Sequence, residues 1–372
     1  MTASGEAAAV AGVAPLPAPA KAAGGLHIPS LDGLRAVSFA FVFLAHAGLD
    51  KLVPGGFGVT VFFFLSGFLI TTLMRLEDQK TGGVSLRGFY LRRVLRIFPP
   101  FYLTLLIAIA LTAAGIVPGG PLAPRPISAL VLHYGNYWFA FHGSDGVPAG
   151  TGVYWSLAVE EHFYLLFPLA YLLTRRLGGR RQGLVFLAGC AAILAWRCWL
   201  VFGVGAPEDR TYLCSDTRFD SILFGCALAV ALNPMVDAPA GGERLWKLVL
   251  LPAAVALLLF SFLYRAPWFR ESLRYTLQGI GLWPLFVCAM RYPTWWPFRA
   301  LNHRRVAFLG VLSYSLYLCH QVAIYTATAW LPALHPALRA VLALAVSLAF
   351  SWTMYRLVEK PFARLRRRFS VA

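Results

Sequence analysis

The feature of this 372-residue sequence that most constrains its fold is a series of long apolar runs. Most runs are about 17–22 residues long, which as an α-helix matches the roughly 30 Å hydrocarbon core of a bilayer. Hydrophobic residues make up 59% of the chain and charged residues only 13%, whereas about a quarter of an ordinary soluble domain is charged. A soluble fold of this size has no interior that could bury so much apolar surface. The sequence therefore predicts an all-α polytopic membrane protein.

The apolar runs predict about ten transmembrane helices in one bundle. They lie near residues 34–50, 57–74, 97–117, 153–173, 183–203, 218–233, 248–264, 275–290, 306–329 and 337–357. A further re-entrant or interfacial segment near 127–141 is compatible with the pattern. We expect a disordered cytoplasmic tail at 1–28, rich in Ala, Gly and Pro, a transmembrane domain at 29–363, and a basic cytoplasmic tail at 364–372.

The net charge of +17 is distributed as membrane topology requires. Lys and Arg cluster between the apolar runs, and a layout with both termini inside places roughly four times as many of them inside as outside. We therefore predict cytoplasmic N- and C-termini, and attraction to anionic lipid head groups rather than to nucleic acid. The six cysteines are scattered without a C-x-x-C pair, so we expect neither a disulfide framework nor a metal site.

The first apolar run carries Arg35 and His46, two ionisable residues on one helical face. Eleven residues make three turns plus about 20°, and they separate the two by about 16 Å along the helix axis. Ionisable residues within a span are costly and are usually functional. A histidine has an unperturbed pKa of about 6.5, so an imidazole here could accept a hydroxyl proton at neutral pH as a general base. The alternative is an interfacial histidine that bonds a backbone carbonyl.

Arg93 and Arg96 precede the third run and are spaced i, i+3, which places them on one helical face. Guanidinium groups at that spacing suit the phosphates of a large anionic donor. The alternative is a pair of topology anchors at the membrane surface.

The fourth run begins with Trp155 and contains Glu160, Glu161 and Tyr164. Glu160 and Tyr164 share a helical face, whereas Glu161 points about 100° away. A carboxylate can orient a catalytic imidazole and stabilise its protonated form. Two solvated carboxylates near a helix N-terminus would explain the same pattern.

Arg218 and His320 are two further ionisable residues within predicted helices. Each is either functional or satisfied structurally by a neighbouring helix. Ser66 and Gly67 are typical of close helix packing. Thr60 either lines a polar path or bonds the carbonyl four residues before it.

Taken in order, these segments resemble one family. Arg35-x10-His46 is followed by FFFLSGFLI, RRVLRIFPPFY, WSLAVEEHFYLLFP, TRFDSILFG, LGVLSYSLYLCH and YRLVEKP. The series, which runs from about Leu31 to Phe362, resembles the acyltransferase family 3 membrane proteins. The resemblance implies transfer of acetyl or other short acyl groups to surface polysaccharides, lipopolysaccharide, peptidoglycan, lipo-oligosaccharide signals or macrolides.

The resemblance also implies roles for matching positions. Arg35 and His46 match the family's basic-x10-His pair, in which the histidine is essential. Arg93 and Arg96 match its R-x-x-R pair on the acyl-donor side.

Glu160 and Glu161 match the family's Glu-Glu pair, where a partner for His46 is expected. The sequence departs from the family at Thr60, where many members have Asp, and at His162, where Gln is common. We expect no C-terminal SGNH hydrolase-like domain.

The resulting hypothesis is an O-acyltransferase of the bacterial cytoplasmic (inner) membrane. It would move an acetyl or other short acyl group from acetyl-CoA or a related acyl-CoA to a hydroxyl of a carbohydrate acceptor, without a metal. The predicted site comprises catalytic His46, Glu160 and Glu161, donor-binding Arg35, Arg93 and Arg96, and acceptor-binding Trp155, Tyr164, Arg218 and His320.

The alternatives are a transporter or flippase of glycan or lipid intermediates, acylation of a small molecule such as a macrolide, and a non-catalytic membrane scaffold. The sequence leaves open the acceptor, the acyl chain length, an acyl-enzyme intermediate, the side of the membrane that the acceptor occupies, and the oligomeric state.

Overall fold

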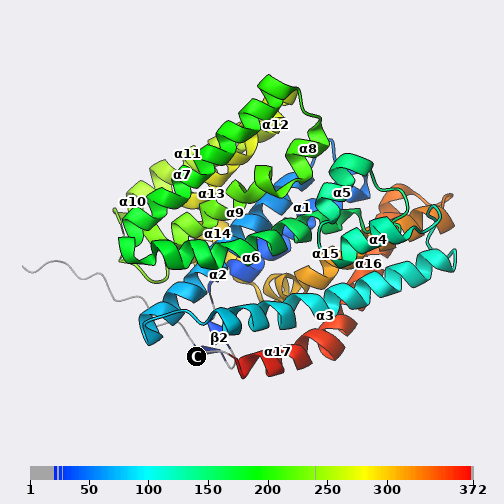
Figure 1. The fold of residues 1–372 in the computed structure, drawn as a ribbon, viewed down its shortest axis with the longest axis horizontal. Coiled ribbons are helices and arrows are strands. Elements are labelled where there is room, and N and C mark those ends of the chain that lie inside the picture. The colour runs from blue at the N-terminus through cyan, green and yellow to red at the C-terminus, as the bar shows by residue number, and fades with distance from the viewer. Residues whose placement is uncertain (1–20, 23–24, 27, 239, 370–372) are drawn as a thin grey trace, which may run out of the picture.

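The computed structural model describes residues 21–22, 25–26, 28–238 and 240–369 (Figure 1). Most of the tail predicted at 1–28 lies outside the described residues. Within it, strands β1 (Lys21–Ala22) and β2 (Gly25–Leu26) form a short antiparallel pair.

Within the described part of the chain, each of the ten predicted segments is helical. The corresponding helices are α1 (Leu31–Leu44) with η1 (Ala45–Leu49), α2 (Gly55–Thr81), α3 (Leu86–Ala113), α6 (Trp155–Thr174), α7 (Gly179–Cys198) with η4 (Trp199–Val204), α9 (Ser215–Ala231), α10 (Glu243–Leu245) with η5 (Trp246–Leu250) and α11 (Leu251–Leu263), α13 (Arg274–Arg291), α15 (Arg304–Trp330), and α16 (Pro336–Met354) with η7 (Tyr355–Glu359) and α17 (Lys360–Arg367).

Seven of these helices are long and apolar enough to cross a membrane, among the residues that the structure describes. The chain is therefore a multi-pass membrane protein. The helices α6, α9 and α13 are not among the seven, so their crossing stays a prediction. The cytoplasmic location of both termini stays a prediction as well.

Short helices connect the long ones. They are α4 (Pro124–Val131), α5 (Gly135–His142), η2 (Gly152–Tyr154), η3 (Arg175–Leu177), α8 (Glu208–Leu213), α12 (Pro267–Glu271), α14 (Trp296–Arg299) and η6 (Ala300–Asn302). Helices α4 and α5 occupy the segment near 127–141 that the sequence marks as re-entrant or interfacial.

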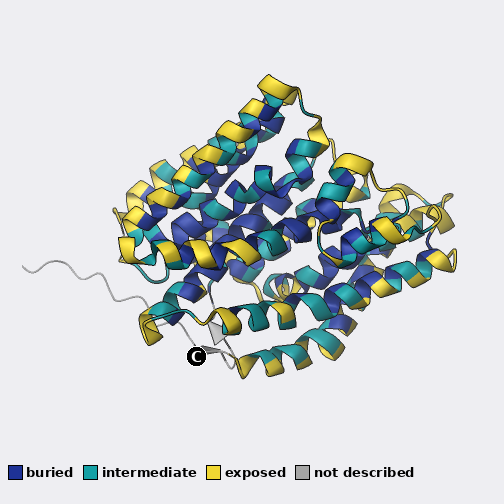
Figure 2. Cartoon of the chain, viewed as in Figure 1, coloured by how far each residue is buried: buried dark blue, intermediate teal, exposed yellow. Residues whose placement is uncertain are grey.

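Helix α2 lies at the centre of the bundle, and the most apolar part of it is 83% buried (Figure 2). It packs along α9, where glycines bring the two backbones together. A methyl group on Gly67 would overlap the carbonyl oxygen of Ile222, and one on Gly225 would overlap that of Phe64. The close packing expected at Gly67 is thus confirmed, and it holds α2 and α9 in a fixed register.

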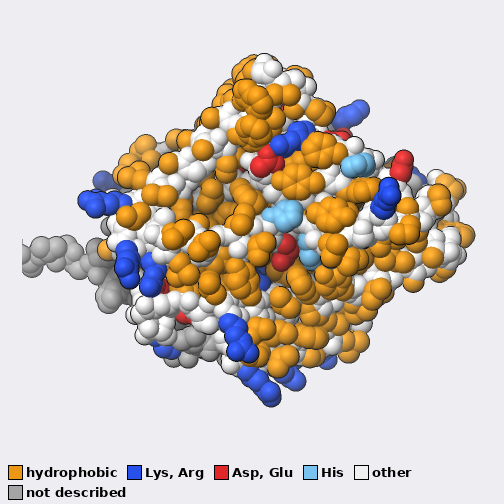
Figure 3. All heavy atoms as spheres, viewed as in Figure 1, with side chains coloured by type: hydrophobic (Ala, Val, Ile, Leu, Met, Phe, Trp, Pro, Cys, Tyr) orange, Lys and Arg blue, Asp and Glu red, His pale blue; other side chains and the backbone are white. Residues whose placement is uncertain are grey.

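The outward faces of the bundle are apolar. Large hydrophobic side chains such as Leu165, Leu169 and Leu173 are more than half exposed. Figure 3 shows one face covered largely by hydrophobic side chains, with Lys and Arg mainly around its edge. This is the surface that a bilayer solvates, since hydrocarbon contact carries no cost for apolar groups.

A buried ion pair joins α7, α9 and α13. Arg197 and Asp220 are both fully buried, and Arg197 Nη2 lies 2.8 Å from Asp220 Oδ2. The guanidinium also donates to the carbonyls of Ser272 (2.7 Å) and Thr217 (2.6 Å) and to the hydroxyl of Thr276 (2.9 Å). Every nitrogen of this cation therefore has a partner, as a charge in a low-dielectric interior requires.

The end of the described chain folds back onto the bundle. Helix α17 packs against α3, as Figure 1 also shows. Beyond its last turn, Arg92 Nη1 donates to the carbonyl oxygen of Phe369 at 2.8 Å. The basic stretch predicted as a tail at 364–372 thus begins inside a docked helix, and its last three residues lie outside the described part.

Candidate active site

Two cavities occupy opposite ends of the helix bundle. One, here called the arginine cavity, lies among the first halves of α1, α2, α3, α6 and α15, and η7. The other, the histidine cavity, lies at the end of α1, the start of α2, α8 and the start of α13. Val59 and Tyr317 line both, so they form part of the wall where the two cavities meet.

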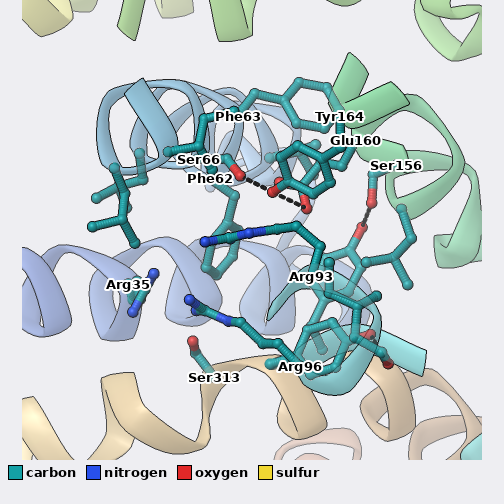
Figure 4. A pocket seen from close by; sticks show the side chains of 18 of the residues that line it. Arg35, Phe62, Phe63, Ser66, Arg93, Arg96, Ser156, Glu160, Tyr164 and Ser313 are labelled. Atoms are coloured by element: carbon teal, nitrogen blue, oxygen red, sulfur yellow. Dashed lines mark hydrogen bonds between the residues drawn. The ribbon is translucent and has the colours of Figure 1, made fainter. Parts of the chain in front are cut away.

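The arginine cavity collects the three arginines expected to bind a donor. Arg35 comes from α1, and Arg93 and Arg96 come from consecutive turns of α3. Figure 4 shows the tips of the three side chains gathered at one end of the cavity. Only Arg35 has an ion-pair partner among the described residues, Asp32 at 3.2 Å. Arg93 Nε is buried without a hydrogen-bond partner, and neither Arg93 nor Arg96 has a direct ion pair among the described residues, although the carboxylates of Glu160 and Glu359 line the same cavity.

The carboxylate Glu160 and its helical neighbour Tyr164 also line the arginine cavity. The Tyr164 hydroxyl donates to Glu160 Oε2 at 3.4 Å and bonds to Ser66 Oγ (Figure 4). The Arg93 guanidinium lies 5.7 Å from the centre of the Tyr164 ring. Glu161 lines neither cavity. The shared face expected for Glu160 and Tyr164 is therefore turned toward the arginines.

His46 lies in the histidine cavity, on a distorted turn of its helix. The α-helix α1 passes into the π-helical turn η1 at Ala45, and Gly48 has a φ of 99°, which favours glycine. Such turns occur frequently at functional sites. The distortion leaves His46 exposed in the cavity while the rest of α1 packs against α2 and α15.

The hydrogen-bond partner of His46 is His320, a fully buried residue of α15. His46 Nδ1 lies 2.9 Å from His320 Nε2, and the two rings stack with their centres 5.1 Å apart. His320 Nδ1 lies 2.8 Å from the carbonyl oxygen of Tyr317. A carbonyl oxygen only accepts hydrogen bonds, so His320 Nδ1 carries the proton and its Nε2 must accept.

It follows that His46 donates its Nδ1 proton to His320. The Nε2 atom of a neutral His46 is then unprotonated and free to accept a proton within the histidine cavity. The family resemblance implied that the partner of His46 would be Glu160 or Glu161. The structure instead brings His320, 274 residues away along the chain, to His46.

The four residues predicted to bind the acceptor are divided between the cavities. Trp155 lines the histidine cavity, and Tyr164 lines the arginine cavity. His320 supports His46 from behind. Arg218 is fully buried beneath the aromatic wall of the histidine cavity, 5.6 Å from the centre of the Trp155 ring.

One cation near the arginine cluster was not among the residues predicted from the sequence. Arg366, on α17, lies near enough to Arg35, Arg93 and Arg96 to interact with their charges. It stands in the stretch predicted as a tail, and only the packing of α17 on α3 brings it there. The run of basic residues was visible in the sequence, but its contact with α3 was not.

Comparison with known proteins places the chain in a family. The family model described as an acyltransferase domain, that of acyltransferase family 3, matches residues 28–356. This protein belongs to that family.

Several curated bacterial proteins are similar to the chain. The peptidoglycan O-acetyltransferase OatA of Listeria monocytogenes is 26% identical over 359 residues, which are 91% of this chain and 56% of that protein. The putative peptidoglycan O-acetyltransferase YrhL of Bacillus subtilis is 28% identical over 90% of this chain and 55% of its own length. A putative O-acetyltransferase of Staphylococcus aureus (strain COL) is 26% identical over 91% of this chain and 58% of its own length.

The chain thus spans a little more than half the length of these relatives. No solved structure matches it.

Proposed function

We propose that this protein is an O-acyltransferase that moves an acetyl group from acetyl-CoA to a hydroxyl of a carbohydrate. The observation that carries the proposal is the free Nε2 of His46, which His320 orients. It lies beside a wall that also borders the cavity in which Arg35, Arg93 and Arg96 gather. A base at one side and a phosphate-binding cluster at the other are the two parts that this reaction needs.

The donor would bind in the arginine cavity. Coenzyme A carries a diphosphate and a further phosphate, which suit the cluster formed by Arg35, Arg93, Arg96 and Arg366. Glu160 and Tyr164 would hold Arg93 in place from α6. The thioester would then extend along α1 and α2 toward the wall at Val59 and Tyr317.

The acceptor would enter the histidine cavity, whose volume of about 420 Å³ is enough for a sugar. His46 Nε2 removes the proton from the acceptor hydroxyl while its oxygen bonds to the thioester carbonyl carbon. The carbon–sulfur bond then breaks, and the sulfur takes the proton back from His46 to leave as the thiol. His320 stabilises the transient imidazolium by accepting its Nδ1 hydrogen bond.

A covalent route would use the same atom. His46 Nε2 would attack the thioester to give an acyl-histidine, which the acceptor hydroxyl then cleaves. The relatives named as peptidoglycan O-acetyltransferases favour a cell-wall glycan as the acceptor and the cytoplasmic membrane of a bacterium as the location.

Replacing His46 with Ala should abolish O-acetylation, because it removes the imidazole that His320 orients as the base. The measurement is mass spectrometry of surface glycans from a deletion strain complemented with each variant. His142→Ala, which removes a histidine outside both cavities, is the matched control and should restore the wild-type acetyl mass. Full acetylation by His46→Ala would refute the proposal, and glycan transfer without any new ester would favour a transporter.

His320→Phe should lower kcat by about 100-fold or more, since removing the partner that fixes a catalytic imidazole's tautomer costs up to roughly 10⁴-fold. The KM for acetyl-CoA should stay within about twofold, because the arginine cavity is untouched. In His320→Gln, the amide oxygen can accept a hydrogen bond from His46 Nδ1–H, so this variant should recover part of kcat. An equal loss in both variants would mean that His320 only fills space.

Arg366→Gln should raise the KM for acetyl-CoA by roughly 5–10-fold, the size expected for one charge-assisted phosphate contact near a surface. Arg364→Gln, an exposed arginine on the same helix, should leave it unchanged. With S-acetyl-N-acetylcysteamine, a thioester without phosphates, Arg366→Gln should match the wild type. A similar defect with both thioesters would show that Arg366 does not contact the phosphates.

A further inference from the structure

Arg218 is a fully buried cation without a carboxylate partner among the described residues. Its Nη2 donates to Thr60 Oγ1 at 3.3 Å, and its Nη1 donates to the carbonyl oxygen of Tyr212 at 3.4 Å. Both bonds are long, and Nε has no partner. The hydroxyl of Thr60 donates its own proton to the carbonyl oxygen of Gly56 at 3.2 Å. It therefore accepts a hydrogen bond from Arg218 but brings no negative charge.

Asp220 acts on Arg218 at longer range but does not neutralise it. One of its oxygens is held by Arg197 at 2.8 Å and by the hydroxyl of Thr276 at 3.2 Å. The other accepts from the amide of Ser221 at 2.8 Å. Two buried arginines thus share one carboxylate, and this part of the bundle keeps an excess positive charge.

Aromatic rings surround the Arg218 guanidinium. The guanidinium carbon, Cζ, lies 3.9 Å from the centre of the Tyr275 ring and 5.2 Å from the centre of the Tyr212 ring. Cation–π contacts contribute roughly 0.5–2 kcal/mol but leave the charge in place. A buried cation without a counter-ion is costly, which favours an anion supplied by a ligand.

Three of the four rings around Arg218 line the histidine cavity, while the fourth, Phe63, lines the arginine cavity. The histidine cavity is also rich in cations. Trp155, Tyr212 and Tyr275 belong to its wall. Its charged lining consists of four basic and two acidic residues: Lys51, Arg265, Arg270, Arg274, Asp50 and Glu208.

Arg274 is a cavity cation that shares an aromatic ring with Arg218. Its guanidinium lies 4.9 Å from the centre of the same Tyr275 ring, and its Nη2 donates to the Tyr275 hydroxyl at 2.9 Å. Its Nε is buried without a partner, and Glu271 is 4.0 Å away. Arg274 therefore has bonding capacity left, within the field of Arg218.

We propose that the acceptor is an acidic sugar, whose carboxylate or phosphate binds Arg274 under the field of Arg218 while its hydroxyl faces His46. This inference rests on the proposed function. Arg218 does not line the cavity, so it contributes attraction through the aromatic wall, where a low dielectric keeps the charge effective over longer distances. Arg274 supplies the direct hydrogen bonds.

The test compares three acceptors that keep the same free hydroxymethyl group. They are N-acetylglucosamine, N-acetylmuramic acid with an added carboxylate, and N-acetylglucosamine 1-phosphate. Purified full-length protein is supplied with acetyl-CoA, and thiol release and acetylated sugar are measured. At least one charged sugar should have a kcat/KM about tenfold or more above that of N-acetylglucosamine, which is the expected preference for a charged acceptor. The charged sugar with the higher kcat/KM shows whether the site prefers a carboxylate or a phosphate.

Thr60→Asp places a carboxylate against Arg218 and should remove most of that preference by raising the KM of the charged sugar. Thr60→Asn, of the same size without charge, should keep the preference. Thr81→Asp adds the same charge to α2 outside both cavities and serves as the matched control. Arg274→Gln should lower the preference as Thr60→Asp does.

Equal kcat/KM for all three sugars in the wild type would overturn this inference and leave the proposed function intact. A loss of kcat in Thr60→Asp that is equal for charged and neutral sugars would also overturn it, because Arg218 would then act on the reacting carbonyl. Thiol release with none of the sugars above the rate of His46→Ala would overturn the proposed function itself. The wild-type comparison needs no variant, so it stands even where Thr60→Asp fails to fold.

Discussion

The hydrogen bond from His46 to His320 depends on how α1 and α15 pack, and the chemistry of the bundle depends on that bond. An isolated imidazole in a membrane cavity has no fixed tautomer. Here the carbonyl of Tyr317 fixes the proton on His320, which fixes the proton on His46 and leaves one nitrogen free. The π-helical turn at the end of α1 presents that nitrogen to the cavity. A neutral second histidine thus takes the orienting place that a carboxylate holds in serine hydrolases.

The buried arginines differ in the ion-pair and hydrogen-bond partners of their guanidinium groups. Arg197 has an ion pair and three further hydrogen bonds, and it ties α7, α9 and α13 together. Arg93 and Arg218 have no ion pair among the described residues, and each retains an unbonded nitrogen. Since unpaired charge is expensive inside a membrane protein, it marks places where an anionic ligand would complete the structure. One such place lies in each half of the site.

The fold was largely predictable from the sequence because apolar runs report helices directly, and each predicted run is helical. Local spacing also placed Arg93 beside Arg96, and Glu160 beside Tyr164, because helical periodicity is a short-range rule. The partner of His46 was not predictable, since no spacing rule connects residues 46 and 320. The approach of Arg366 to the arginine cluster was not predictable either, because the docking of α17 on α3 is a tertiary contact. The buried state of Arg218 likewise depends on rings from four different helices.

The central claim is that donor and acceptor enter from opposite ends of the bundle and meet at His46. The most direct measurement uses proteoliposomes with the protein in one orientation, acetyl-CoA trapped inside or added outside, and a membrane-impermeant sugar acceptor on one side only. Entry from opposite ends requires that acetylated sugar forms only when acetyl-CoA is on the side of the arginine cavity and the sugar is on the other. Product formed only when both are on the same side would contradict it.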